Sequence, residues 1–245
     1  MKIKLKEILI GVLVAVLALV IGCVIYINDN YEASEAAMAL IETPAEDIHL
    51  IVDEAGRMVF EPDDATSGII FYPGGKVEAE SYAPLLSALA EEGILTVLVP
   101  MPVNLAVLDP DAAEGIVEEF SYIENWYMAG HSLGGAMAAS YLAEQTESDY
   151  FKGLILLAAY STEDLSKTDL GVLSVYGDQD KVLDKEKYEK YYTNLPVDGT
   201  YEEIIKGGNH AQFGDYGEQD GDGKAKISAK EQVKQTVEAV KGFVE

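Results

Sequence analysis

The sequence is poor in cysteine and histidine. Its 245 residues include one cysteine, Cys23, and three histidines. Because Cys23 stands near the N-terminus, the remainder of the chain has no second cysteine for a disulfide, so its stability must come from a hydrophobic core. Histidine is the usual catalytic base near neutral pH, and here the choice is limited to three positions.

Basic residues are also few. The chain has 17 Lys and Arg against 43 Asp and Glu, a formal net charge of -26. A chain with this net negative charge repels the phosphates of nucleic acids, and it has too few basic residues to bind anionic lipid over a broad surface. We therefore expect an acidic exterior and no nucleic-acid partner.

An uncharged apolar run extends from Ile8 to Ile27. At the rise of an α-helix its length is sufficient to cross a bilayer core. Lys2, Lys4 and Lys6 stand before the run, and Asp29, Glu32 and Glu35 stand after it. Because lysines stay on the cytoplasmic side, the pattern predicts an N-terminal transmembrane anchor with everything after Ile27 outside the cytoplasm.

Two other interpretations of this segment stay open. Val20-Ile21-Gly22-Cys23 has the form of a lipoprotein processing site, in which Cys23 would carry the lipid, although apolar residues continue after it. A cleaved signal peptide is the third interpretation, with an apolar region normally shorter than this one. All three predict an extracytoplasmic main domain. We expect an anchor or signal segment over residues 1–27, a linker over 28–45 and one domain over 46–245.

Short apolar segments alternate with helical segments through this domain. Strands are predicted at 49–52, 57–60, 68–72, 94–99, 126–129, 153–158, 171–176 and 201–205, and helices at 82–92, 112–122, 133–145, 185–194 and 228–244. This alternation is typical of an α/β fold with a mostly parallel sheet covered by helices on both faces. In such sheets functional groups collect at the carboxyl ends of the strands.

The segment Gly130-His131-Ser132-Leu133-Gly134 stands between an apolar strand and an alanine-rich helix. A Gly-x-Ser-x-Gly sequence in that context has the form of a nucleophile elbow. The tight turn would lift the Ser132 hydroxyl out of the fold and direct the N–H of Leu133 at the same point. That N–H and the positive end of the helix would then stabilise an oxyanion.

A serine hydroxyl becomes a useful nucleophile only when a base takes its proton. His49 precedes the first strand, at the wrong end of the sheet, and His131 lies inside the elbow with its side chain directed away from that of the serine. His210 follows the last predicted strand in a glycine-rich loop. We therefore predict His210 as the base.

Two further groups are needed for acyl transfer, and the sequence offers two candidates for each. Asp178 and Asp180 both follow the strand that ends at Tyr176, and either could orient His210. The turn after the strand at 68–72 could supply the second oxyanion donor, from the N–H of Gly75 or, alternatively, of Lys76.

Four motifs carry a family resemblance, in the order Phe71-Tyr72-Pro73-Gly74-Gly75, Gly130-His131-Ser132-Leu133-Gly134-Gly135, Tyr176-Gly177-Asp178-Gln179-Asp180-Lys181-Val182 and Gly208-Asn209-His210. The chain resembles the α/β-hydrolase superfamily, most of all its compact bacterial branch related to dienelactone hydrolases. The resemblance implies a Ser-Asp-His triad with the acid at Asp180. Two positions depart from the family pattern. Dienelactone hydrolases have a cysteine where this chain has Ser132, and many relatives have histidine where it has Pro73.

Only a dozen residues separate the strands at 153–158 and 171–176, which leaves no room for a cap domain and suggests an open site. The acidic segment from Asp215 to Gly223 does not have the spacing of an EF-hand calcium loop. With Gly223 as the invariant glycine of such a loop, the twelfth position is Ala229, where a glutamate is needed. We expect no metal and no cofactor. The sequence thus predicts a serine hydrolase acting on small esters or thioesters, with a non-catalytic binding module and an acyltransferase as alternatives.

Overall fold

The computed structural model describes residues 5–145 and 149–245, and these fall into two compact units, Met1–Asn30 and Tyr31–Glu245. The first unit contains the helix α1 (Leu5–Asn28), and its side chains from Ile10 to Val24 are all exposed. Over the described residues, the structure has no helix whose length and apolar character would suffice to span a membrane. Lys2 and Lys4, which the orientation of the predicted anchor depends on, lie outside the described residues.

The described residues of the second unit form an eight-stranded sheet in the order β1-β2-β4-β3-β5-β6-β7-β8. The strands are β1 (Ile48–Val52), β2 (Met58–Pro62), β3 (Ser67–Tyr72), β4 (Ile94–Leu98), β5 (Asn125–His131), β6 (Phe151–Leu157), β7 (Gly171–Gly177) and β8 (Thr200–Ile205). The pairs that join β1 to β2 and β2 to β4 are antiparallel, and all other pairs are parallel. The mostly parallel sheet expected from the sequence is confirmed.

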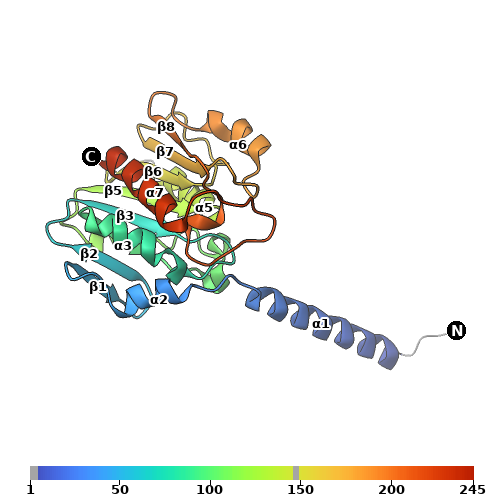
Figure 1. Ribbon diagram of the computed structural model, residues 1–245. Helices are drawn as coiled ribbons and strands as arrows, with labels where there is room; N and C mark the ends of the chain where they lie inside the picture. The colour runs from blue at the N-terminus through green and yellow to red at the C-terminus, as the bar shows by residue number, and fades with distance from the viewer. Residues whose placement is uncertain (1–4, 146–148) are drawn as a thin grey trace. The chain divides into compact units, whose positions relative to one another are not determined.

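Helices cover both faces of this sheet (Figure 1). They are α2 (Glu35–Glu42), α3 (Ala83–Glu91), α4 (Ile116–Glu119), α5 (Leu133–Glu144), α6 (Lys185–Tyr191) and α7 (Ala229–Val244). One hydrophobic cluster joins one face of the sheet to α3 and α7, and a second joins the other face to α5. The sheet is therefore the middle layer between two cores.

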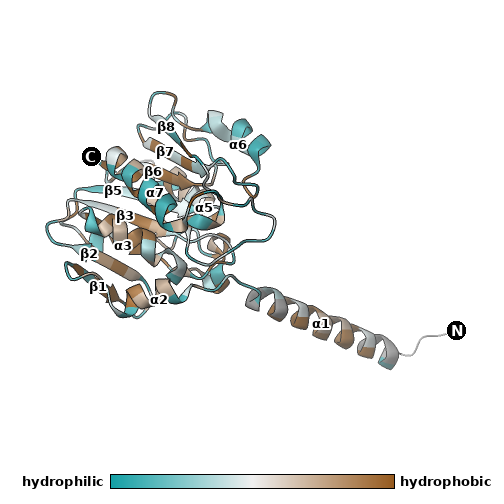
Figure 2. Ribbon diagram, in the orientation of Figure 1, coloured by the Kyte–Doolittle hydropathy of each residue, from teal (hydrophilic) through white to brown (hydrophobic). Residues whose placement is uncertain are grey.

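The residues of β3 show how one strand serves both cores. Ile69 and Phe71 belong to the cluster beneath α3 and α7, whereas Ile70 and Tyr72 belong to the cluster beneath α5. Successive side chains of a strand point to opposite faces, so a strand buried on both faces must be apolar throughout. Figure 2 shows this hydrophobic colouring in the central strands, and more hydrophilic colouring on α7.

The helix predicted over residues 112–122 is the main departure in secondary structure. The structure has a single helical turn there, α4. Gly115, directly before it, has φ 81°, a left-handed conformation that a right-handed helix does not continue through. The preceding residues form short turns instead. The pattern of apolar residues was therefore helical in period, but the backbone at Gly115 limits the helix to residues after it.

The compact unit begins at Tyr31, ahead of the domain start expected at residue 46. Tyr31 forms an isolated parallel bridge with Val77, and its N–H donates to the carbonyl of Lys76 at 2.8 Å. Ser34 caps α2 by accepting the N–H of Ala37. The segment expected as a linker thus contributes a helix and backbone hydrogen bonds to the folded unit.

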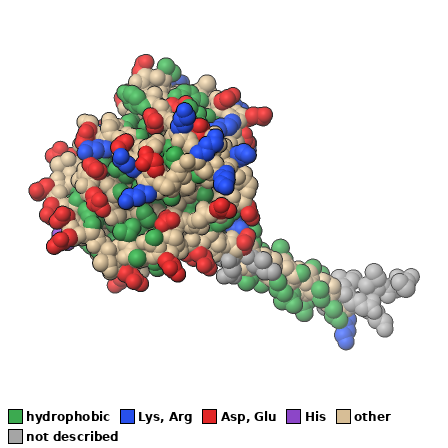
Figure 3. Space-filling view, viewed as in Figure 1, with side chains coloured by type: hydrophobic (Ala, Val, Ile, Leu, Met, Phe, Trp, Pro, Cys, Tyr) green, Lys and Arg blue, Asp and Glu red, His purple; other side chains and the backbone are tan. Residues whose placement is uncertain are grey.

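Two surface features bear on the site. Acidic side chains are spread over the visible face and are interspersed with Lys and Arg (Figure 3). Between β6 and β7 the described residues 158–170 form no helix or strand. The structure therefore shows no cap inserted at that position of the fold.

Candidate active site

The four predicted site groups come from four different strands. Gly75 follows β3, Ser132 follows β5, Asp180 follows β7 and His210 follows β8. These strands run parallel within the continuous order β3-β5-β6-β7-β8. Their carboxyl ends share one edge of the sheet, and the fold thus gathers the four groups there.

The backbone at Ser132 is strained in the way an elbow requires. Its φ is 52° and its ψ -118°, an uncommon conformation for a residue with a side chain. Its N–H donates to the carbonyl of Leu157 at 2.9 Å, and α5 begins at the next residue. A Cβ at Gly134 would overlap the carbonyl oxygens of Tyr72 and Pro73. Glycine there lets α5 begin directly against the end of β3.

His210 and Asp180 form a buried pair. The Nδ1 of His210 lies 2.9 Å from Oδ2 of Asp180, and both side chains are almost fully inaccessible. The other oxygen of Asp180 accepts the N–H groups of Val182 and Leu183, each at 2.8 Å. Burial acts to raise the pKa of the Asp180 carboxyl, but the hydrogen bond and charge of His210, with the two N–H groups, hold that pKa below its ordinary value. Asp180 is therefore a carboxylate at neutral pH.

Asp178, the alternative acid, lies elsewhere in the same turn. Its side chain is exposed, and its Oδ1 accepts the N–H of Gly207 at 2.7 Å. Of the two acids left open by spacing alone, the structure brings Asp180 to His210 and uses Asp178 to tie the turn after β7 to the end of β8.

The second ring nitrogen of His210, Nε2, is buried and has no hydrogen-bond partner within the described part of the chain. In the neutral form of the imidazole, an Nδ1 that donates to this carboxylate leaves the lone pair on Nε2. A buried polar atom without a partner costs free energy, and such atoms are retained where they have a task. The Oγ of Ser132 does not form a hydrogen bond to it here, and such bonds commonly tighten only when substrate binds.

The loop after β3 that contains Gly74, Gly75 and Lys76 lies against the start of α5. A Cβ placed on Gly75 would lie 3.0 Å from Cδ2 of Leu133, so these two residues are immediate neighbours. The N–H of Lys76 donates to the carbonyl of Asn104 at 2.7 Å and is thus occupied. Between the two candidates from the sequence, the structure leaves the N–H of Gly75 available beside the N–H of Leu133.

Tyr82 and His131 connect this loop to the buried pair of His210 and Asp180. The sequence analysis gave neither residue a role in the site. The hydroxyl of Tyr82 accepts the N–H of Gly74 at 2.9 Å and forms a hydrogen bond of 2.8 Å with Nδ1 of His131. The ring of His131 packs 4.4 Å from the ring of His210, between centroids. Burial, followed by the charge of His210, lowers the pKa of His131 well below its ordinary value. His131 is therefore neutral at neutral pH.

Gln232 on α7 is a further residue that the sequence did not single out. It is fully buried, its Oε1 accepts the N–H of Asn209 at 3.0 Å, and its Nε2 donates to the carbonyl of Asn209 at 2.8 Å. Both backbone groups of the residue before His210 are thereby held. Gln232 and Thr236 are the polar members of the buried face of α7, at helical spacing with Val240, but this spacing does not mark the contact with Asn209.

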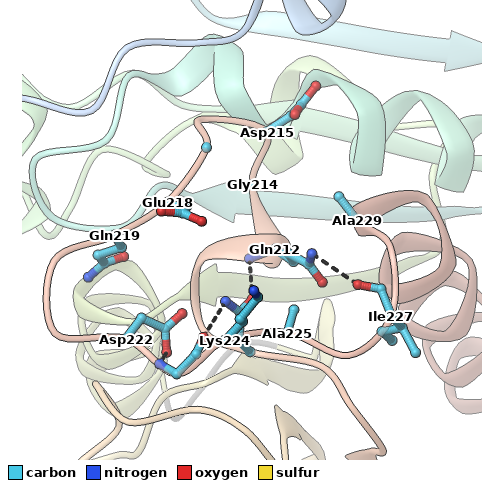
Figure 4. Close-up of a pocket in the computed structure, with 13 residues that line it drawn as sticks. Gln212, Gly214, Asp215, Glu218, Gln219, Asp222, Lys224, Ala225, Ile227 and Ala229 are labelled. Carbon is cyan, nitrogen blue, oxygen red and sulfur yellow. Dashed lines mark hydrogen bonds between the residues drawn. The ribbon is translucent and has the colours of Figure 1, made fainter.

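A cavity of about 530 Å³ is lined mainly by the loop from Gly214 to Ile227, and Figure 4 shows its lining residues. Asn209, Gln212 and Asp222 contribute polar atoms to it. No group of three or more His, Cys, Asp or Glu among residues 5–145 and 149–245 is arranged to hold a metal ion.

Comparisons with known proteins agree with this architecture. No curated protein shows a significant match in sequence. Among solved structures, a predicted CIB-like hydrolase from Thermoplasma acidophilum is similar, with a TM-score of 0.54 and 17% identity over 80% of this chain and 99% of that one. Carboxyl esterase 2 from the mycorrhizal fungus Tuber melanosporum has a TM-score of 0.61 and 15% identity, over 89% and 92% of the two chains.

An esterase from Pyrobaculum calidifontis has a TM-score of 0.59 and 17% identity, over 86% of this chain and 91% of that one. At these identities the three structures establish a shared fold. The sequence model of the alpha/beta hydrolase family matches residues 68–234, which include every motif of the site. This chain is a member of the alpha/beta hydrolase family.

Proposed function

We propose that this protein is a serine hydrolase that cleaves small carboxylic esters or thioesters through an acyl-enzyme. The observation that carries the proposal is the buried pair of His210 and Asp180, with the unpaired Nε2 of His210 at the sheet edge that also presents Ser132. A neutral imidazole whose Nδ1 is held by a carboxylate presents the lone pair of Nε2 at the edge that carries Ser132, which is the arrangement that general-base activation of a hydroxyl needs.

In the proposed reaction the Oγ of Ser132 attacks the carbonyl carbon while Nε2 of His210 takes its proton. The resulting oxyanion accepts the N–H groups of Gly75 and Leu133. The proton on Nε2 passes to the departing alcohol or thiol, which leaves Ser132 acylated. Water then attacks the acyl carbon, giving up a proton to His210, and the acid product departs with Ser132 restored. Asp180 stabilises the imidazolium in both halves.

The choice of substrate class rests on the environment of the site. The connection of residues 158–170 is too short and irregular to enclose a long chain, which favours small or exposed acyl groups. Two of the similar solved structures are described as esterases, which is consistent with this class. Relation to dienelactone hydrolases in particular stays a prediction, with Ser132 where those enzymes have cysteine.

Labelling of the full chain with a fluorophosphonate probe tests the proposal. We expect one equivalent of label per chain, attached to Ser132 when the labelled peptide is mapped by mass spectrometry, and hydrolysis of short acyl esters by the same preparation. Products formed with and without an added alcohol would separate a hydrolase from an acyltransferase. A folded chain that takes no label, or takes it at another residue, would contradict the proposal and favour a binding module.

We also propose that the N-terminal segment holds the enzyme at a membrane, with the catalytic unit outside the cytoplasm. The support is the uncharged run Ile8–Ile27 and the exposure of its described side chains from Ile10 to Val24. Mass spectrometry of the N-terminal peptide from the membrane fraction should find an intact, unmodified segment. A lipid on Cys23 or a new N-terminus would replace the spanning anchor with a lipoprotein or a cleaved signal. Recovery of the intact chain entirely in the soluble fraction would refute membrane attachment.

A further inference from the structure

The loop between His210 and α7 returns to the dyad through a single carboxylate, that of Asp222. Its Oδ2 accepts the N–H of Ala211 at 3.0 Å, and its Oδ1 accepts the N–H of Lys181 at 3.2 Å. Ala211 directly follows His210, and Lys181 directly follows Asp180. One half-buried side chain therefore joins the two backbone turns that carry the two members of the pair.

Neighbouring contacts hold Asp222 in this place. The N–H of Gly223 donates to its Oδ1 at 2.6 Å, and Nδ2 of Asn209 donates to the carbonyl of Gly223 at 2.9 Å. A Cβ on Gly223 would overlap the carbonyl oxygen of Gln179, so the loop lies tightly against the turn after β7. In Figure 4 the carboxylate of Asp222 points from the arc of the loop towards its inner side.

The geometry of the pair depends on the separation of these two turns. On the side of the sheet they are joined by backbone bonds, from Gln179 N–H to the carbonyl of Gly208 at 2.9 Å and from Asp178 N–H to the carbonyl of Ile205 at 3.1 Å. These two bonds join residues that precede Asp180 and His210 in the chain. The bonds to Asp222 come from Lys181 and Ala211, the residues that directly follow Asp180 and His210. The side chains of His210 and Asp180 thus lie between these two sets of bonds, and on the outer side the carboxylate of Asp222 joins both turns by itself.

We infer that Asp222 is a positioning residue, which holds His210 and Asp180 at catalytic separation by accepting the N–H groups of Ala211 and Lys181. The inference rests on the proposed function of the pair. Asp222 does not touch the reacting atoms. Its carboxylate suits the task because both oxygens are acceptors, whereas an amide at the same place offers one acceptor and turns a donor towards the other N–H. We therefore expect the loss of activity to be larger when both acceptor oxygens are removed than when one is retained.

Three variants of the full chain test this role, Asp222→Ala, Asp222→Asn and the matched control Asp220→Ala. Asp220 is an exposed acid of the same loop, so its replacement changes the charge equally. We expect Asp222→Ala to lower kcat for a short ester, and the rate of fluorophosphonate labelling, by about 10- to 100-fold, because a displacement of about 1 Å can cost 10²-fold. KM should change little. Asp222→Asn should lie between Asp222→Ala and wild type, and Asp220→Ala should match wild type.

Proton NMR supplies a readout that needs no substrate. The Nδ1 proton shared between His210 and Asp180 should give a downfield resonance in wild type and Asp220→Ala, identified by its absence in Asp180→Ala. It should be lost or displaced in folded Asp222→Ala. If that variant fails to fold, Asp222→Asn carries the same comparison. A folded variant at Asp222 with wild-type kcat, labelling rate and resonance would overturn the inference. Absence of labelling in wild type would instead refute the proposed function, while the resonance still reports on Asp222.

Discussion

Replacing Ser132 with alanine should abolish ester hydrolysis and fluorophosphonate labelling, with a fall in kcat of about 10⁶-fold, the scale seen when the nucleophile of a serine triad is removed. The reason is chemical, because alanine has no oxygen to form the acyl-enzyme. The fold should survive, since alanine has a Cβ like serine and meets the backbone strain at φ 52° equally well. Hydrolysis of a short acyl ester and labelling of the full chain measure the effect.

Ser140→Ala is the matched control. Ser140 is a half-buried serine of α5, the helix that begins just after Ser132, so the same substitution is made in the same element. It should leave hydrolysis and labelling unchanged. Ester hydrolysis that persists in purified Ser132→Ala at a rate near wild type would show that another residue, or no covalent intermediate, carries the reaction.

Asp180→Asn should lower kcat by about 10⁴-fold, as the corresponding change does in a serine protease triad. Activity should fall because the contacts of the two carboxylate oxygens determine how an asparagine amide would be oriented. The oxygen of asparagine will stay with the N–H groups of Val182 and Leu183, so its NH₂ group will face Nδ1 of His210. That amide donates, which leaves Nδ1 as the acceptor and places the proton on Nε2. An Nε2 that already carries a proton cannot take one from Ser132.

Asp178→Asn is the control for this change, since the two acids stand two residues apart in one turn. Asp178 is exposed and its contacts are to Gly207 and Gln179, so we expect activity within a few-fold of wild type. Steady-state kinetics at neutral pH, where both acids are ionised, makes the comparison. Loss of activity in Asp178→Asn with retention in Asp180→Asn would reverse the assignment of the acid.

The sequence predicted the sheet, and the edge of it at which the candidate site residues lie, because both depend on local patterns. A run such as Gly68 to Tyr72 is apolar at every position, which marks a strand buried on both faces, and the glycines around Ser132 mark a turn too tight for side chains. Once the strands are parallel, residues that follow them must share an edge. The positions of Gly75, Ser132, Asp180 and His210 at that edge required no further information.

The residues that hold this arrangement together could not be found in the same way. Asp222 acts on Lys181, 41 residues away, and Gln232 acts on Asn209, 23 residues away, in each case through backbone N–H groups that any residue would supply. The residue type at Lys181 or Asn209 therefore gives no sign of the contact. The choice between Asp178 and Asp180 was open for a related reason, because the direction of each side chain depends on the exact path of one turn.

The attachment of Tyr31 to the loop after β3 decides where this protein can be shortened. Tyr31 donates to the carbonyl of Lys76 and accepts the N–H of Glu78, and Ser34 donates through Oγ to Asp215. A form trimmed at residue 46, the boundary that the sequence suggests, would remove α2 together with these bonds, which include two to the loop that carries Gly75. A cleavage site or affinity tag therefore belongs before Tyr31, where the catalytic unit keeps its own first segment.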